Sequence, residues 1–369
     1  MKIAILAILA LAVAAEFNER NAHLLKGTEK LPELDLYSLY SQFTKEFERD
    51  SNYESFATFS ANLNRIRTHN SDPSNSYTMG VNKFSDLTWE QFKETLMLRE
   101  GQDACWPMET PNTLEEIPDG DLPKEVDWRE KDIVTSVKDQ GSCGSCWAFA
   151  TTAVVEARLA KETNWRINLS EQQVVDCARP FGTLGCGGGL PSRGFEYLAS
   201  AGGQDTLEDY GYEGKDTLPC RFNLTKAPAD TRGFSVNITA KEEGQMAKAV
   251  AFTGPIAISF EVIDSFRFYS GGVFSDEKCG TNYTDVNHDV AIVGYGFDEA
   301  SGKNYWLLKN SWGLGFGVKG YFKLERDVNM CGVSLCASFP KHVDLRHRKP
   351  PHPPHKPHHR RHHDSSFLG

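Results

Sequence analysis

Two cysteines separated by two residues stand at the start of a predicted helix. Residues 140–149 read Gln-Gly-Ser-Cys-Gly-Ser-Cys-Trp-Ala-Phe. The glycines and serines favour a tight turn, and helix-forming residues follow over 146–160. The positive end of the helix dipole favours the thiolate of Cys146, as a nucleophile requires. Taken alone, the Cys143–Cys146 spacing fits a nucleophile, a redox dithiol or half of a zinc site.

One histidine, His288, lies between residues 122 and 340. An imidazole base that works with Cys146 in this region therefore has a single candidate. Asn310, at the end of a predicted strand, offers a neutral amide oxygen to orient the ring. Gln140 can place a side-chain N–H beside the backbone N–H of Cys146, and two such donors stabilise an oxyanion. These residue types together predict acyl transfer.

The first residues predict entry into the secretory pathway. Residues 1–15 contain one lysine, an apolar run and small residues at 13–15, as a signal peptide does. No other stretch approaches the ~18 apolar residues of a membrane span, so no membrane association is expected. The secretory route permits disulfides, and nine cysteines leave at least one unpaired. Sequons for a glycoprotein occur at Asn168, Asn223, Asn237 and Asn282.

Charge is unevenly distributed along the chain. The formal net charge is −10, although residues 341–369 carry seven Lys and Arg against two Asp. A body this acidic argues against nucleic-acid binding. The segment 341–369 also holds eight histidines and five prolines, and we expect it to be disordered. It is compatible with a solvated basic extension, a metal-binding tract or a pH-responsive segment.

Composition divides the rest of the chain into two parts. Residues 16–121 are polar and helix-prone, with a short strand expected over 80–88 and a helix capped by Thr88 and Gln91. The end of this part, 101–123, has the composition of an exposed linker.

Residues 122–340 have the amino-acid composition of a folded domain. Helices are predicted in its first half and strands in its second half, which indicates an α+β fold with two lobes and a site between them. The predicted helices are 146–160, one opened by Ser170 and Gln173, and 192–199; the predicted strands are 255–262, 288–296, 305–310 and 320–325.

Several spaced motifs resemble the papain family of cysteine proteases. They are the segment 140–147, the pair 287–288 and the segment 310–313, supported by 127–129, 169–173, 185–189 and 294–296. The N-terminal part resembles the inhibitory propeptide of the family at Phe59, Asn62, Ile66, Asn70, Gly80, Asn82, Phe84 and Asp86. The sequence departs from the family pattern at Ser51, Ser55 and Phe316.

The resemblance implies a papain-like two-lobe fold, with a helical left lobe, a β-barrel-like right lobe and an N-terminal helical propeptide. It implies no cofactor and no metal. Expected partners are peptide or protein substrates, the chain's own propeptide as an inhibitor, and cystatin-type inhibitors. The implied catalytic residues are Cys146 as nucleophile, His288 as base, Asn310 as orienter and Gln140 as oxyanion donor; the implied substrate-binding residues are Gly188, Gly189, Trp312 and Asn287.

The resemblance also implies how the cysteines pair. The expected bridges are Cys143–Cys186, Cys177–Cys220, Cys279–Cys331 and Cys105–Cys336, which leaves Cys146 free. In the cathepsin H branch of the family, a bridge like the last one retains a short propeptide remnant, expected here around 101–110, which restricts the enzyme to aminopeptidase action. The alternative for the bridge is that it only holds the linker in place. The alternatives for the function are an unrestricted endopeptidase and a catalytically silent binding or storage protein of the same fold.

Overall fold

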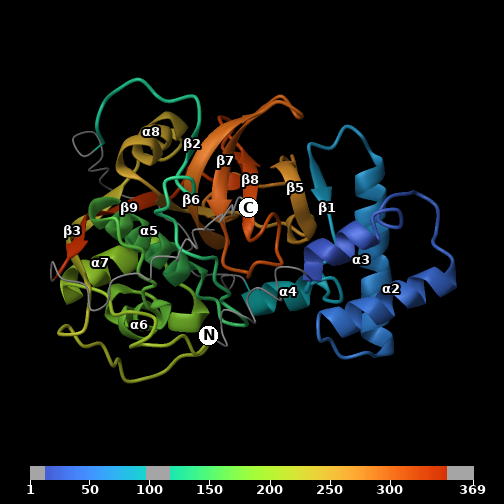
Figure 1. Cartoon of the computed structure of the whole chain (residues 1–369), viewed down its shortest axis with the longest axis horizontal. Helices are drawn as coiled ribbons and strands as arrows, with labels where there is room; N and C mark the ends of the chain where they lie inside the picture. The colour runs from blue at the N-terminus through green and yellow to red at the C-terminus, as the bar shows by residue number, and fades with distance from the viewer. Residues whose placement is uncertain (1–12, 97–116, 347–369) are drawn as a thin grey trace, which may run out of the picture.

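The computed structural model describes residues 13–96 and 117–346 (Figure 1). The predicted signal peptide and the segment around 101–110 lie almost wholly outside the described residues. Among the described residues, no helix has both the length and the apolar character needed to span a membrane.

The N-terminal part is a helical unit beside the sheet (Figure 1). It contains α2 (Glu33–Glu46), α3 (Tyr53–Ser71), β1 (Tyr77–Met79) and α4 (Trp89–Leu96). The first two helices pack through aromatic rings, with the Phe43 and Phe59 centroids 4.8 Å apart. The polar positions of the propeptide motif also have structural partners, because the buried amide of Asn62 donates to the carbonyls of Ser85 and Leu87.

The predicted strand over 80–88 is wrong in position. The strand β1 ends at Met79, and residues 83–87 form turns. Asn82 explains the difference, because its side-chain oxygen accepts from the Phe84 N–H and closes a turn. The predicted cap is confirmed: the Thr88 N–H donates to Gln91 Oε1 at 2.8 Å, and the Gln91 N–H donates to Thr88 Oγ1 at 3.2 Å.

Three helices form the helical lobe. They are α5 (Cys146–Thr163), α6 (Glu171–Cys177) and α7 (Pro191–Ala201), close to the predicted ranges. Ser170 caps α6 by accepting from the Gln173 N–H at 3.0 Å. The Gln173 side chain does not complete the predicted box, because its amide donates to Tyr197 and to the Gly203 carbonyl instead.

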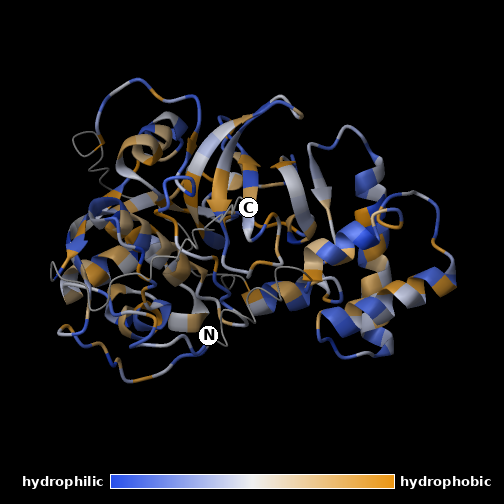
Figure 2. Ribbon diagram, in the orientation of Figure 1, coloured by the Kyte–Doolittle hydropathy of each residue, from blue (hydrophilic) through white to orange (hydrophobic). Residues whose placement is uncertain are grey.

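The second lobe is built on a nine-stranded sheet. The strand order is β1-β5-β8-β7-β6-β4-β9-β3, with β2 paired to β6. Strand β6 is buried from His288 to Gly296, and Figure 2 shows hydrophobic residues along the central strands. The strands are β2 (Val126–Asp127), β3 (Ala229–Asn237), β4 (Ile256–Phe260), β5 (Tyr269–Phe274), β6 (His288–Asp298), β7 (Lys303–Lys309), β8 (Tyr321–Glu325) and β9 (Ala337–Leu345), with helix α8 (Glu243–Lys248) between β3 and β4.

The last strand corrects the predicted end of the folded domain. Strand β9 continues past residue 340 to Leu345, because it pairs with β3 as far as Leu345. Val343 in this extension is buried. The rest of the predicted tail, 347–369, lies outside the described residues.

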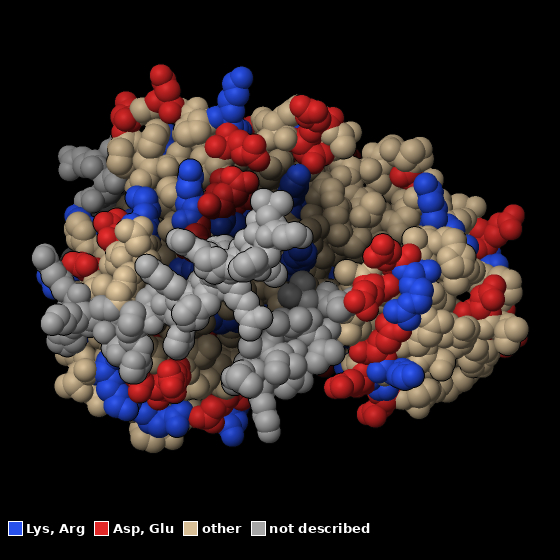
Figure 3. Space-filling view, viewed as in Figure 1, with Lys and Arg blue, Asp and Glu red and all other residues tan. Residues whose placement is uncertain are grey.

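The surface of the described residues carries charges of both signs. Figure 3 shows Lys and Arg interspersed with Asp and Glu over both the propeptide side and the lobes. The excess of negative charge is therefore not gathered into a single patch on this face.

Candidate active site

Cys146 is the first residue of α5, as the sequence predicts. The turn before it is held by the Cys143–Cys186 disulfide and by a hydrogen bond of 3.0 Å from the Gly144 N–H to the Cys186 carbonyl. Ser145 Oγ lies 2.7 Å from the hydroxyl of Tyr212. Among the described cysteines, Cys146 is the one free thiol. The turn thus fixes the start of the helix and with it the position of the sulfur.

The sulfur of Cys146 is fully buried and lies 3.8 Å from Asp289 Oδ2. Burial raises the pKa of the Cys146 thiol well above its ordinary value, and the charge of Asp289 raises it further. The prediction that the helix dipole would favour a thiolate is therefore wrong for the chain in this state. The dipole effect is modest, whereas desolvation of a buried charge is large.

His288 is held in one tautomer at the start of β6. Its Nε2–H donates to Asn310 Oδ1 at 2.9 Å, and the Ser311 N–H donates to the same oxygen at 2.8 Å. Nδ1 has no partner among the described residues, so its lone pair is available. Burial lowers the pKa of His288 to about 4, although the Asn310 hydrogen bond opposes the shift.

Trp312 covers the imidazole. The two ring centroids lie 4.7 Å apart, and the indole is buried. Two propeptide side chains, Phe84 and Phe92, pack edge-on against Trp312 at 5.7 and 5.4 Å. The propeptide therefore lies directly on the side of the site that the resemblance assigns to the leaving group.

Gln140 is buried and joins the two lobes. Its Oε1 accepts from Ser311 Oγ at 2.6 Å, and its backbone N–H donates to the Ser311 carbonyl at 2.8 Å. Its Nε2 donates to the Cys143 carbonyl at 3.0 Å and to the carbonyl of Leu96 at 3.1 Å. Leu96 ends the propeptide helix α4. A peptide carbonyl of the propeptide thus occupies the predicted oxyanion donor.

The predicted substrate-binding residues fall into two groups. Gly188 has φ +124° at the end of a short 3-10 turn, and a side chain on Gly189 would meet the Trp147 ring at 2.7 Å. Gly188 is therefore favoured by its backbone conformation, and Gly189 by the close approach of the Trp147 ring. Both amide atoms of the Asn287 side chain bind the backbone of Val262, at 2.8 and 3.1 Å, and its role in substrate binding stays a prediction. That contact gives Asn287 a structural role at the start of β6.

Three disulfides lie within the described residues: Cys143–Cys186, Cys177–Cys220 and Cys279–Cys331. Cys336 is also disulfide-bonded. The remaining prediction, a bridge from Cys105, falls outside the described residues. Cys336 lies in a buried apolar cluster with Cys146, Val286 and Leu335, so this bridge is anchored close to the free thiol.

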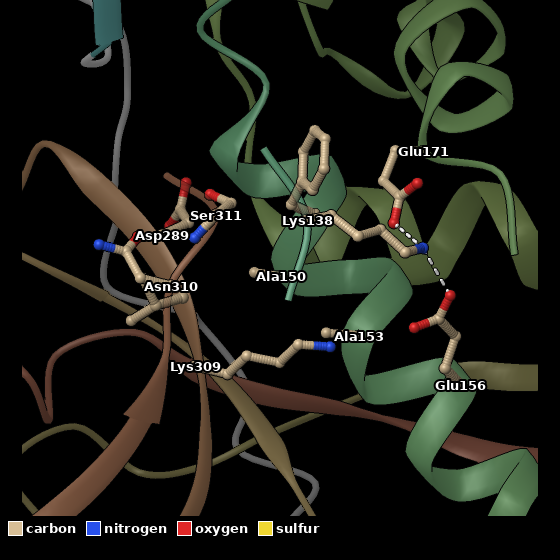
Figure 4. Close-up of a pocket in the computed structure, with 11 residues that line it drawn as sticks. Lys138, Ala150, Ala153, Glu156, Glu171, Asp289, Lys309, Asn310 and Ser311 are labelled. Atoms are coloured by element: carbon tan, nitrogen blue, oxygen red, sulfur yellow. Dashed lines mark hydrogen bonds and ion pairs between the residues drawn. The ribbon is translucent and has the colours of Figure 1, made fainter. Parts of the chain in front are cut away.

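A buried charged network between the lobes was not predicted from the sequence (Figure 4). Lys138 Nζ lies 2.7 Å from Glu156 and 2.5 Å from Glu171, and Lys309 Nζ donates to Thr135. The two lysines and the two glutamates line a cavity of about 20 Å³, about the space of one water molecule. Charged residues scattered along a sequence carry no signal that they will meet in one core.

Asp289, which lies against the thiol, was not predicted either. A signal was available, because a lone carboxylate interrupts an otherwise apolar strand directly after the candidate base.

No group of three or more His, Cys, Asp or Glu in the described ranges has the arrangement of a metal site.

Two family profiles match this chain. The papain family cysteine protease profile matches residues 122–341, and the cathepsin propeptide inhibitor domain matches residues 40–92. Thiol protease aleurain of Arabidopsis thaliana is 47% identical over 285 residues, 77% of each chain. Pro-cathepsin H of Bos taurus is 40% identical over 315 residues, 85% of this chain and 91% of the relative.

Solved structures agree with these matches. The proform of Amb a 11, a ragweed pollen cysteine protease, superposes with a TM-score of 0.73 at 33% identity and covers 84% of this chain and 95% of its own. A recombinant stem bromelain precursor superposes with a TM-score of 0.72 at 33% identity and covers 83% and 98%. Both are similar to this chain in the propeptide-bearing form.

Proposed function

Because this chain belongs to the papain family of cysteine proteases, we propose that it is a cathepsin H-like aminopeptidase whose nucleophile is Cys146. Its family and its inhibitor domain make it a cysteine protease with a propeptide, that is, a zymogen. The finer proposals concern the role of each site residue and the restriction to substrates with a free N-terminus.

The roles of the site residues follow from their hydrogen bonds. With Nε2–H given to Asn310, the neutral His288 ring presents Nδ1 as a base for the thiol proton. The Cys146 thiolate attacks the peptide carbonyl, and His288 then protonates the departing amine. Water activated by the same imidazole adds to the acyl-enzyme and releases the acid.

Gln140 supplies a donor to the developing oxyanion. Its Nε2–H already binds a peptide carbonyl, that of Leu96, at 3.1 Å. When the propeptide leaves, the same N–H can turn to the substrate carbonyl oxygen, whose negative charge grows in the transition state. The latent state and the catalytic state would therefore use one donor in turn.

The aminopeptidase restriction is supported by one observation: Cys336 is disulfide-bonded within the buried cluster that contains Cys146. Six of the other cysteines pair in three bridges and Cys146 is free, so Cys105 is the remaining candidate partner. A remnant tied there would fill the far end of the cleft. Its terminal carboxylate would then attract the α-amino group of a substrate.

Paired fluorogenic arginyl substrates, one with a free amine and one blocked, test this restriction. We expect the mature enzyme to prefer the free amine. The double variant Cys105→Ser with Cys336→Ser should lose that preference and gain cleavage of the blocked substrate. The matched control, Cys177→Ser with Cys220→Ser, removes a disulfide that lies elsewhere in the helical lobe and should keep the preference.

A mature enzyme that prefers the blocked substrate, with or without the Cys336 bridge, would show an endopeptidase and refute the remnant. The proposed chemistry at Cys146 would stand in that case, because both substrates are cleaved by the same nucleophile.

The compartment and the inhibitors complete the proposal. Cathepsin-type proteases with propeptides typically enter the secretory pathway, and three described disulfides suit an oxidising compartment. Within that pathway we propose a lysosomal or vacuolar destination, or secretion. A cystatin-type inhibitor should compete with substrate for the mature enzyme, and not for the chain whose cleft still holds its propeptide.

A further inference from the structure

Asp289 is a buried carboxyl group that the proposed mechanism does not use. It follows His288 in β6 and is 1% exposed. One of its oxygens, Oδ2, lies 3.8 Å from Cys146 Sγ. The other, Oδ1, accepts from Ser259 Oγ at 2.5 Å, across the paired strands β4 and β6. The carboxyl group is thus held in place beside the sulfur.

No cation among the described residues pairs with this carboxyl group. The nearby charges are already engaged. Lys138 binds Glu156 and Glu171 (Figure 4), and Lys309 donates to Thr135. Strand β4, which packs against Asp289, offers Ser259 and otherwise apolar residues. The remaining ionisable neighbours are Cys146 on α5 and His288, which is adjacent along β6.

The charge of this carboxyl group acts on the sulfur. A carboxylate at this distance repels a thiolate, and its charge raises the pKa of the Cys146 thiol. Burial without a cation in turn raises the pKa of Asp289 to about 8. Asp289 is therefore neutral at acid and neutral pH, when its O–H can point to the sulfur, and it is ionised only in alkaline solution.

We propose that Asp289 is a positioning residue for the cysteine protease chemistry and controls the charge state of the Cys146 sulfur. The neutral carboxylic acid donates a hydrogen bond to the thiolate and supports the nucleophile. The carboxylate accepts the S–H instead, and holds the sulfur as a neutral thiol. His288 Nδ1 remains the acceptor of the thiol proton in the active state, so Asp289 takes no proton from the substrate.

The inference rests on the proposed role of Cys146, and it predicts a change in pH dependence. Asp289→Asn keeps a donor and removes the ionisation. We expect its kcat/KM to match the wild type at acid pH. The pH at which kcat/KM falls in alkaline solution, the alkaline limb of the pH profile, should be higher by about one pH unit or more. In the full chain, ultraviolet absorbance of the thiolate, with a Cys146→Ser chain subtracted, should show a lower thiol pKa in Asp289→Asn.

Two further variants separate this effect from a structural one. Asp205→Asn changes another buried acid, whose carboxylate accepts from the Asn223 N–H, and it should leave the alkaline fall of kcat/KM at the same pH. Ser259→Ala removes the hydrogen bond that stabilises the carboxylate, so it should raise the pH of the alkaline limb by a smaller amount. This variant keeps the inference testable even if Asp289→Asn does not fold.

The inference would be overturned if kcat/KM fell at the same alkaline pH in the wild type, Asp289→Asn and Ser259→Ala. An equal loss of kcat/KM at every pH would also overturn it, because that result indicates a packing role. Peptidase activity in a Cys146→Ser chain would instead refute the proposed nucleophile, so the two failures are distinguishable.

Discussion

At the residue scale, the sequence is enough to propose the reacting groups, whereas their charge state depends on the folded structure. A single histidine in the folded domain and the Gln140–Cys146 spacing are visible in the sequence. The pKa of Cys146 depends on burial and on Asp289, which reaches the sulfur only through the pairing of distant segments. The dipole of a helix is a local property, whereas desolvation is a property of the whole core.

The same scale gives a prediction for Gln140. Gln140→Ala removes the side-chain donor that binds the Leu96 carbonyl in the closed chain. We expect kcat to fall by roughly 10²–10³ with little change in KM, because the lost interaction is strongest in the transition state. Steady-state kinetics on the mature variant provide the measurement.

A variant whose KM rises while kcat is unchanged would assign Gln140 to ground-state binding instead. Asn287→Ala is a useful comparison, because Asn287 precedes His288 yet binds the Val262 backbone. Its main effect should be on stability, seen as a lower melting temperature.

At the element scale, helix starts could be predicted from neighbouring residues, whereas two strands that depend on distant partners could not. The Thr88–Gln91 cap and the start of α5 follow from neighbouring residues. Strand β5 reads Tyr-Ser-Gly-Gly-Val-Phe, a weak strand sequence, and it forms because β1 and β8 pair with it from distant parts of the chain. Strand β9 extends past residue 340 for the same reason.

The contact between α4 and the catalytic lobe leads to a prediction about latency. Phe92 on α4 is fully buried against Trp312, so Phe92→Ala should loosen the propeptide at a cost of about 3–5 kcal/mol. We expect faster activation, and measurable peptidase activity under conditions in which the wild-type chain is latent. The rate at which activity appears after dilution into substrate gives the comparison.

Phe56→Ala is the matched control, because Phe56 stacks on Tyr37 within the propeptide and does not contact Trp312. Equal activation rates for Phe92→Ala and Phe56→Ala would show that general loosening of the propeptide, and not the Trp312 contact, controls latency.

At the scale of the whole molecule, the two-lobe α+β fold and the N-terminal helical unit were expected from composition and from the family motifs. The sequence did not reveal how tightly the propeptide closes the candidate active site. The closure depends on β1 pairing with β5, on α4 reaching Gln140, and on aromatic packing over Trp312. All three join residues from separate parts of the chain.

This arrangement explains how one chain can carry both a protease and its inhibitor. The propeptide gives a carbonyl to Gln140, the proposed oxyanion donor, and aromatic rings to the indole that covers His288. Each contact would be occupied by substrate, or exposed, after the propeptide leaves. Latency and catalysis are therefore alternative uses of the same surface.

The proposed role of Cys146 as the nucleophile of a cysteine protease can be tested by alkylation. The mature enzyme is alkylated to completion, peptide mapping locates the label, and peptidase activity is followed in the same samples. The account predicts that one label per molecule, on Cys146, abolishes activity in proportion to its incorporation. Activity that persists after full modification of Cys146 would contradict it.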